Sequence, residues 1–177
     1  MASFPSWVTA NRLKVSALVV ISLIHAAALA APFTFSWTGF IVCLVLVWVT
    51  GGLGITLCYH RLLTHRSYRT YKPIEYVLTC FGCLALQGGP ITWVATHRLH
   101  HKESDEEHDP HTPTHTFWWS HMMWNFFKDP QLDGYEKIRR FAKDLDKDRV
   151  LRFFERYFFP LYVLLAVLLY VIGHLAS

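Results

Sequence analysis

Charged residues are scarce in this chain. Asp, Glu, Lys and Arg make up 17% of its 177 residues, whereas hydrophobic residues make up 53%. A soluble domain usually carries roughly 25% charged residues, so this composition favours a membrane protein. The formal net charge is only +4, and the basic residues are not interleaved along one surface-forming element. We therefore expect no nucleic-acid partner.

Cysteine is also sparse, and its placement argues against a disulfide framework. The four cysteines lie inside apolar runs rather than in loops. Cys80 and Cys83 form a C-x-x-C pair, which small apolar residues on a membrane helix explain more simply than redox chemistry does. The N-terminal region lacks an A-x-A-like cleavage site after a short apolar stretch. We therefore interpret the first apolar run as a retained membrane anchor.

Three apolar runs are long enough to be membrane spans: residues 15–31, 40–57 and 158–175. Each just crosses a hydrocarbon core of roughly 30 Å at about 1.5 Å per residue. Lys and Arg flank the first two runs at their outer ends and are absent from the linker between them. The positive-inside rule then places the N-terminus and residue 60 in the cytoplasm. We predict an all-α, multi-pass membrane protein, a transmembrane helical bundle with a cytosolic helical region.

Two further segments have less regular patterns. Residues 74–95 are apolar but interrupted by Gln-Gly-Gly-Pro at 87–90. We expect an interfacial or re-entrant segment that returns to the cytoplasmic side; a single crossing is the alternative and would separate His60 from His97. Residues 141–159 have helical apolar spacing and predict a cytoplasmic amphipathic helix. Pro160 would then lie in the first turn of the last span.

Nine of the eleven histidines lie between residues 60 and 121. "HRLLTH" holds His60 and His65, whose rings would diverge by about 140° on an ideal α-helix. "HRLHH" holds His97, His100 and His101, which share one helix face at metal-ligand spacing. Imidazole suits iron, zinc and copper.

The position after the first histidine of "HRLHH" excludes one class of metalloenzyme. A zincin metalloprotease has Glu there, whereas this chain has Arg98. The later histidines His108, His111, His115 and His121 have no clear assignment. The carboxylates near them offer hydrogen bonds that would orient a ligand, or simply form a solvated acidic face: Asp105, Glu106, Glu107 and Asp109. His25 and His174 lie singly in apolar spans, where a local hydrogen bond explains them.

The motifs "HRLLTHRSY" and "HRLHHKESDEEHDPH", whose boxes HRLLTH and HRLHH are separated by 31 residues, resemble together with the following "FWWSHMMW" the membrane fatty-acid desaturases. The likeness runs from about residue 38 to the end and is strongest to the Δ9, stearoyl-type branch. It implies a di-iron centre on the cytosolic side of four transmembrane helices. That centre would use O2 to desaturate an acyl chain, with electrons from ferredoxin or cytochrome b5. The iron ligands that it implies are His60, His65, His97, His100 and His101. Gln87 and Trp93 would contact the substrate, although an interfacial role explains Trp93 equally well.

Two departures from the family pattern qualify this resemblance. The family has a third box, H-x-x-H-H, after a fourth span, and neither occurs here. We therefore expect residues 1–177 to be the N-terminal part of one desaturase domain, with three spans present and the fourth missing. Five ligands would leave the two irons incompletely held and the chain alone inactive. Ala95-Thr96 replaces the Arg-Asp of animal acyl-CoA enzymes, which favours a lipid-bound or carrier-bound acyl chain.

Three other functions remain open. A hydroxylase or ketolase of the same histidine-box class would oxygenate its substrate instead of desaturating it. A metal transporter would place polar ligands inside its spans, where this chain has almost none. A non-catalytic remnant is compatible with every motif.

Overall fold

The computed structural model describes residues 4–104 and 106–175, and it confirms the all-α prediction. Among these residues there is no strand, only one isolated antiparallel bridge between Leu13 and Phe127. Three elements are short 3-10 helices (η1, η2 and η4), and η3 is a π-helix. In chain order the elements are η1 (Ala10–Arg12), α1 (Val15–Ala28), η2 (Ala31–Thr34), α2 (Trp37–Val47), η3 (Trp48–Thr64), α3 (Lys72–Cys83), α4 (Pro90–Lys102), α5 (Phe117–His121), η4 (Met123–Phe126), α6 (Tyr135–Phe141) and α7 (Arg149–Leu175).

Within the part of the chain that the structure describes, two helices are long and apolar enough to cross a membrane. One is formed by α2 and η3 without interruption (Trp37–Thr64, 28 residues), and the other is α7 (27 residues). Most of the apolar side chains in α2 and in the last part of α7 are exposed, as lipid-facing side chains are. The apolar helix α1 is shorter, with 14 residues. It ends at Ala28, before the predicted end at residue 31, and Ala31 and Pro32 belong instead to the short helix η2.

The last long helix differs from its prediction at its start. The expected amphipathic helix over residues 141–159 is wrong in its first part, because α7 begins only at Arg149. Asp148 caps this start: its Oδ1 accepts from the Val150 N–H at 2.9 Å and the Leu151 N–H at 3.4 Å. From there α7 runs on through Pro160, which lies inside the helix and not in its first turn. Proline is tolerated within such apolar helices when neighbouring groups satisfy the freed carbonyl.

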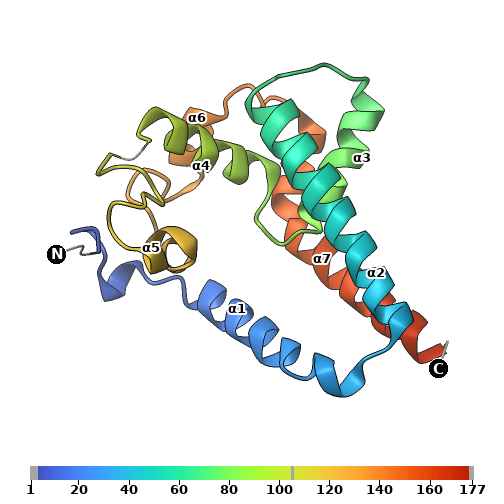
Figure 1. Cartoon of the computed structure of the whole chain (residues 1–177). Coiled ribbons are helices and arrows are strands. Elements are labelled where there is room, and N and C mark those ends of the chain that lie inside the picture. Colours follow the sequence, from blue (N-terminus) through green and yellow to red (C-terminus); the bar gives the residue numbers. More distant parts are fainter. Residues whose placement is uncertain (1–3, 105, 176–177) are drawn as a thin grey trace.

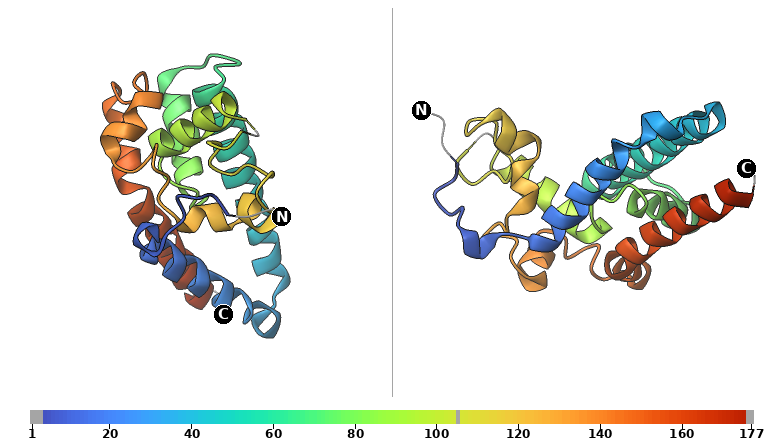
Figure 2. Two further views of the ribbon diagram at one scale, coloured as in Figure 1. Left: turned by 90° about the vertical axis from the view of Figure 1, so that its left-hand side faces the viewer. Right: turned by 90° about the horizontal axis from the view of Figure 1, so that it is seen from below.

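The bend predicted at Gln-Gly-Gly-Pro separates α3 from α4. Leu86 and Gly88 both have positive φ, 56° and 106°, and Pro90 occupies the first position of α4, where a missing N–H costs nothing. α3 lies between η3 and α7 and packs against both (Figures 1 and 2).

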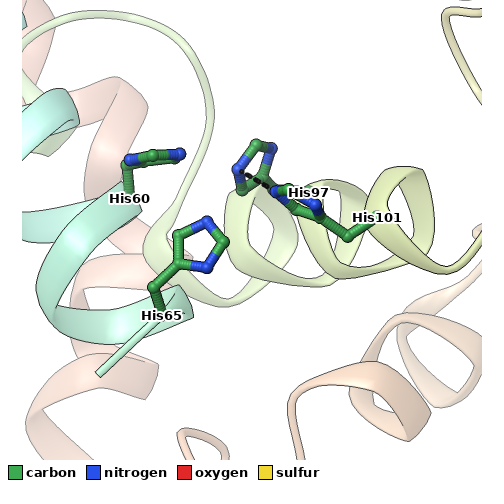
Figure 3. A group of neighbouring side chains, drawn as sticks. All are labelled: His60, His65, His97 and His101. Carbon is green, nitrogen blue, oxygen red and sulfur yellow. Dashed lines mark hydrogen bonds between the residues drawn. The ribbon is translucent and has the colours of Figure 1, made fainter. Parts of the chain in front are cut away.

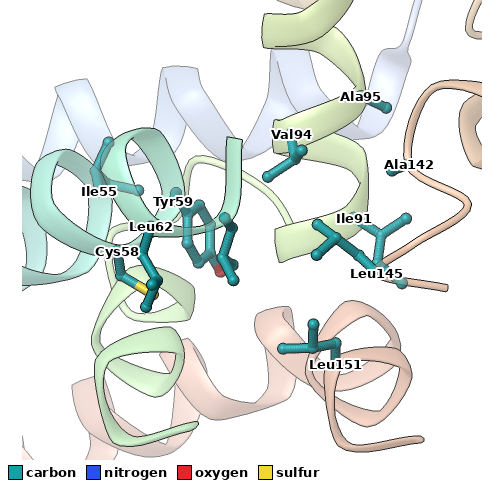
Figure 4. Close-up of a cluster of buried hydrophobic side chains, with 11 residues drawn as sticks. Ile55, Cys58, Tyr59, Leu62, Ile91, Val94, Ala95, Ala142, Leu145 and Leu151 are labelled. Carbon is teal, nitrogen blue, oxygen red and sulfur yellow. The ribbon is translucent and has the colours of Figure 1, made fainter. Parts of the chain in front are cut away.

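The core lies where η3, α4 and the start of α7 meet (Figure 4). Tyr59 from η3, Ile91 and Val94 from α4, and Leu151 from α7 are all buried. The two segments that carry the histidine motifs therefore share one packed interior. Burial of several large apolar side chains, each contributing about 1.5–3 kcal/mol, holds these segments together.

The N-terminus of α4 is held by an acidic side chain from α7. Glu155 Oε2 accepts from the backbone N–H groups of Ile91 at 2.8 Å and Thr92 at 3.0 Å, and the Thr92 hydroxyl also donates to this carboxylate. The first N–H groups of a helix have no partner within the helix, and a carboxylate is favoured at that end. Gly89 lets Glu155 approach, because a Cβ there would meet the Glu155 side chain.

We expect Glu155→Ala to destabilise the protein by about 1–3 kcal/mol, since it leaves these partly buried donors without an acceptor. The matched control is Glu136→Ala, which removes a glutamate that is 80% exposed and pairs only with Arg139 and is expected to change stability by less than about 1 kcal/mol. Thermal unfolding of both variants in the same detergent gives the comparison. Equal stabilities would contradict the capping role.

Candidate metal centre

Four histidines from two helices converge on one point (Figure 3). His60 and His65 come from the end of η3, and His97 and His101 come from α4. Ring centroids lie 4.8 Å apart for His60 and His97, and 4.8 Å apart for His65 and His101. The two motifs are therefore on the same side of the molecule, which rules out the separation that the single-crossing alternative required.

The predicted divergence of His60 and His65 is wrong, and the π-helix is the reason. In a π-helix each N–H bonds to the carbonyl five residues earlier, so residues five apart lie on one face. The His65 N–H donates to the His60 carbonyl at 3.0 Å. The two ring centroids are only 4.5 Å apart. The H-x4-H spacing thus suits one ion on this helix, whereas it would not on an α-helix.

On α4 the three histidines do not all face the same way. His97 and His101 are four residues apart, and their Nε2 atoms are 3.2 Å apart. His100 directly precedes His101, and successive residues of an α-helix are about 100° apart around its axis. His100 is therefore not part of the four-histidine group, although its ring centroid is only 5.9 Å from that of His97.

The four imidazoles fit a metal ion. One candidate ligand atom from each side chain lies within 4.8 Å of the others. Two nitrogens on opposite sides of an ion bound at about 2.0–2.1 Å are about 4 Å apart, so small side-chain shifts close the site. Burial and the neighbouring rings of His101 and His60 lower the pKa of His97 to about 3. His97 is therefore neutral at neutral pH, as a metal ligand must be.

A second group of possible ligands lies beside the first, around His100. The His100 Nδ1 is 2.9 Å from Oδ1 of Asp109, whose carboxylate is fully buried. The His111 ring stacks on His100 with centroids 4.2 Å apart. These three residues form a second set that is able to hold an ion. A carboxylate that accepts from Nδ1 also leaves Nε2 of His100 free to bind a metal.

From the sequence, Asp109 was only one of four carboxylates that could orient a ligand, and His111 had no clear assignment. The signal that identifies them is "DPH", in which the two side chains follow His100 by nine and eleven residues. Glu106 and Glu107 are exposed and form the solvated acidic face, while Asp105 lies outside the described residues. His25 has the local hydrogen-bond partner that was predicted, since its Nδ1 lies 2.8 Å from the Ile21 carbonyl oxygen.

Gln87 and Trp93 lie next to the four-histidine group. The Trp93 indole N–H donates to Gln87 Oε1 at 3.3 Å. The Trp93 ring is 4.9 Å from that of His97 and 6.5 Å from that of His60. Trp93 therefore lies beside His97 and His60, and Gln87 is bonded to the Trp93 indole.

Comparison with known proteins identifies the family. Residues 35–177 match the family described as fatty acid desaturase. The chain belongs to the fatty acid desaturase family.

Several curated desaturases are similar to the chain. It is 47% identical over 152 residues to the sn-1 stearoyl-lipid 9-desaturase of Anabaena variabilis, which covers 85% of this chain and 55% of that protein. It is 41% identical over 157 residues to the sn-2 palmitoyl-lipid 9-desaturase of a Nostoc species, covering 88% and 55%. An acyl-CoA 5-desaturase of Anemone leveillei is 43% identical over 169 residues, covering 95% and 52%. The chain spans about half the length of these relatives.

Proposed function

We propose that this desaturase acts on a fatty acyl chain in an iron-dependent and O2-dependent reaction, with the regiochemistry of the Δ9 branch. The observation that carries the proposal is that four histidine side chains from both motifs place their ligand atoms within 4.8 Å of one another. Family membership and the names of two relatives, a stearoyl-lipid and a palmitoyl-lipid 9-desaturase, support the reaction class.

The proposed centre holds two irons. The four-histidine group binds one, and His100 contributes to the second, with Asp109 hydrogen-bonded to its other ring nitrogen. Bound iron would activate O2, which is the oxidant that removes two hydrogens from an unactivated chain, a step that no side chain can carry out. The residues of this chain hold the imidazoles in place and keep His97 unprotonated.

Gln87 and Trp93 are proposed to contact the acyl chain. Their mutual hydrogen bond fixes the indole ring beside His97, so that the apolar ring face is available to a methylene chain. The favoured substrate is a lipid-bound or carrier-bound acyl chain, because Ala95 and Thr96 stand where the animal acyl-CoA enzymes have the charged pair Arg-Asp. An acyl-CoA substrate is the alternative, since one relative is named for it.

The membrane placement follows from the apolar helices. We propose that α1, α2–η3 and α7 cross the bilayer, with α1 and α2–η3 as a hairpin, so that the N-terminus and both histidine motifs lie on the cytoplasmic side. That side gives a soluble electron donor, a ferredoxin or cytochrome b5, access to the metal centre.

The experiment is replacement of the His97 codon by alanine in the source cells, followed by gas chromatography of acyl lipids. The proposal predicts a fall in the fraction of chains that carry the double bond and a rise in their saturated precursors. An unchanged acyl profile would contradict it. Loss of a hydroxylated or keto product instead would reassign the protein to a hydroxylase or ketolase of the same class.

A further inference from the structure

One arginine connects the two helices that carry the histidines. Arg98 lies directly after His97 on α4, and its guanidinium reaches the end of η3. Its Nη2 donates to the Leu63 carbonyl at 3.0 Å. Leu63 is in the last turn of η3, between His60 and His65, where backbone carbonyls lack partners within the helix.

The same guanidinium is held on its other side by the loop after α6. Asp144 receives it in a two-pronged contact, from Nη1 to Oδ1 at 2.7 Å and from Nη2 to Oδ2 at 3.0 Å. Nη1 also donates to the Phe141 carbonyl at 2.9 Å. Four hydrogen bonds therefore join η3, α4 and this loop through one planar group, a geometry that lysine does not reproduce.

Asp144, the acidic partner of Arg98, is partly buried and ionised. The side chains of Arg98 and Asp144 are 23% and 29% exposed, so water competes only partly for the contact. Burial alone would raise the pKa of Asp144, but hydrogen bonds from Arg98 and Arg66 outweigh it and lower the pKa to about 2. The carboxylate is therefore ionised over the whole range in which histidines bind metal.

We propose that Arg98 and Asp144 are positioning residues that set the spacing between the η3 and α4 histidines, and hence the metal affinity of the four-histidine group. The His60–His97 and His65–His101 pairs both cross this interface, at 4.8 Å each. A change in the separation of the two helices alters both pairs together. This inference rests on the proposed metal centre and adds to it two residues that are not themselves metal ligands.

The test measures Co²⁺ binding to the purified full chain in detergent, by the visible absorption that reports ligand geometry. We expect Arg98→Met and Asp144→Asn each to weaken Co²⁺ binding by about 10–100-fold, as loss of a residue that orients ligands does. Combining the two changes is expected to weaken binding by less than the product of the two single effects, because both remove the Arg98–Asp144 contact, while Asp144→Asn also weakens the pair with Arg66. Arg98→Lys, which keeps the charge but not the fork, is expected to fall between wild type and Arg98→Met.

The matched control is Arg152→Met. Arg152 also donates to a carbonyl of the same loop, that of Asp146, but this bond joins the loop to α7 and not to the two histidine-bearing helices. We expect the Co²⁺ affinity of the Arg152→Met variant to stay within about 3-fold of wild type. Its circular dichroism spectrum should match that of Arg98→Met, which shows that both variants are folded to the same extent.

Three results would overturn the inference. The first is folded Arg98→Met with wild-type affinity and absorption spectrum, and the second is equal weakening by Arg152→Met. If Arg98→Met does not fold, Arg98→Lys decides, and wild-type affinity in that variant is the third. Absence of Co²⁺ binding by the wild-type chain itself would instead contradict the proposed metal centre, so the two failures are distinguishable.

Discussion

Replacing His97 with alanine is expected to abolish metal binding by the four-histidine group while leaving the fold intact. His97 is central to the site: its ring centroid lies 4.6 Å from that of His101, 4.8 Å from His60 and 5.5 Å from His65. Losing a direct ligand costs more than the 10–100-fold that loss of a supporting residue costs. Equilibrium dialysis against Fe²⁺ under anaerobic conditions, with metal analysis, measures the effect.

The control for this prediction is His25→Ala. His25 is an exposed histidine of α1 whose ring is bonded to its own helix, so its removal should not change the metal content. If the His97 variant kept the same bound iron as the His25 variant, the four-histidine group would not be the metal site.

The second large effect is expected at Gly54, where η3 and α3 touch through their backbones. A Cβ on Gly54 would lie 2.5 Å from the Phe81 carbonyl carbon and 2.7 Å from Gly82 Cα. Backbone atoms cannot rotate away as a side chain can, so the two helices must separate. We expect Gly54→Ala to destabilise the protein by about 3 kcal/mol, the upper part of the range for overpacking. Because His60 and His65 follow on the same helix, metal affinity should fall as well.

Gly51→Ala is the matched control on the same helix. Apart from its chain neighbours and the nearby backbone of its own helix, no atom of the described residues lies within 4 Å of the position that its Cβ would occupy. Alanine also favours helix over glycine by roughly 0.5–1 kcal/mol, so this variant should be as stable as wild type or slightly more so. Thermal unfolding of both variants by circular dichroism gives the comparison. A Gly54 variant as stable as the Gly51 variant would show that the helices do not meet there.

The histidine motifs and their common location were predictable from the sequence, because spacing and residue type carry that information. His97 and His101 have the i, i+4 spacing of an α-helix and meet as expected. His60 and His65 also meet, but for a reason that the α-helical period hides. The glycines that precede these histidines in the sequence do not predict a π-helix. Only the structure shows that residues five positions apart lie on the same face of η3.

Residues whose role depends on contacts between distant segments were not predictable. Asp109 reaches His100 because the chain turns back after α4, and Asp144 meets Arg98 from 46 residues away. The sequence places Asp109 among four carboxylates that could orient a ligand without distinguishing it from them, and Asp144 looks like an ordinary surface carboxylate. Pro160 is a related case, since a proline near the start of an apolar run favours a helix start. The Asp148 cap instead starts α7 earlier and carries it through the proline.

The central claim is that imidazoles from both motifs bind iron together. The most direct test is iron K-edge X-ray absorption of the anaerobically Fe²⁺-loaded chain, compared with His97→Ala. The account predicts a nitrogen-rich first shell with the outer-shell scattering of several imidazoles in the wild-type chain, and a marked loss of that scattering in the variant. Iron surrounded by oxygen without imidazole scattering, or the same spectrum in both proteins, would contradict it.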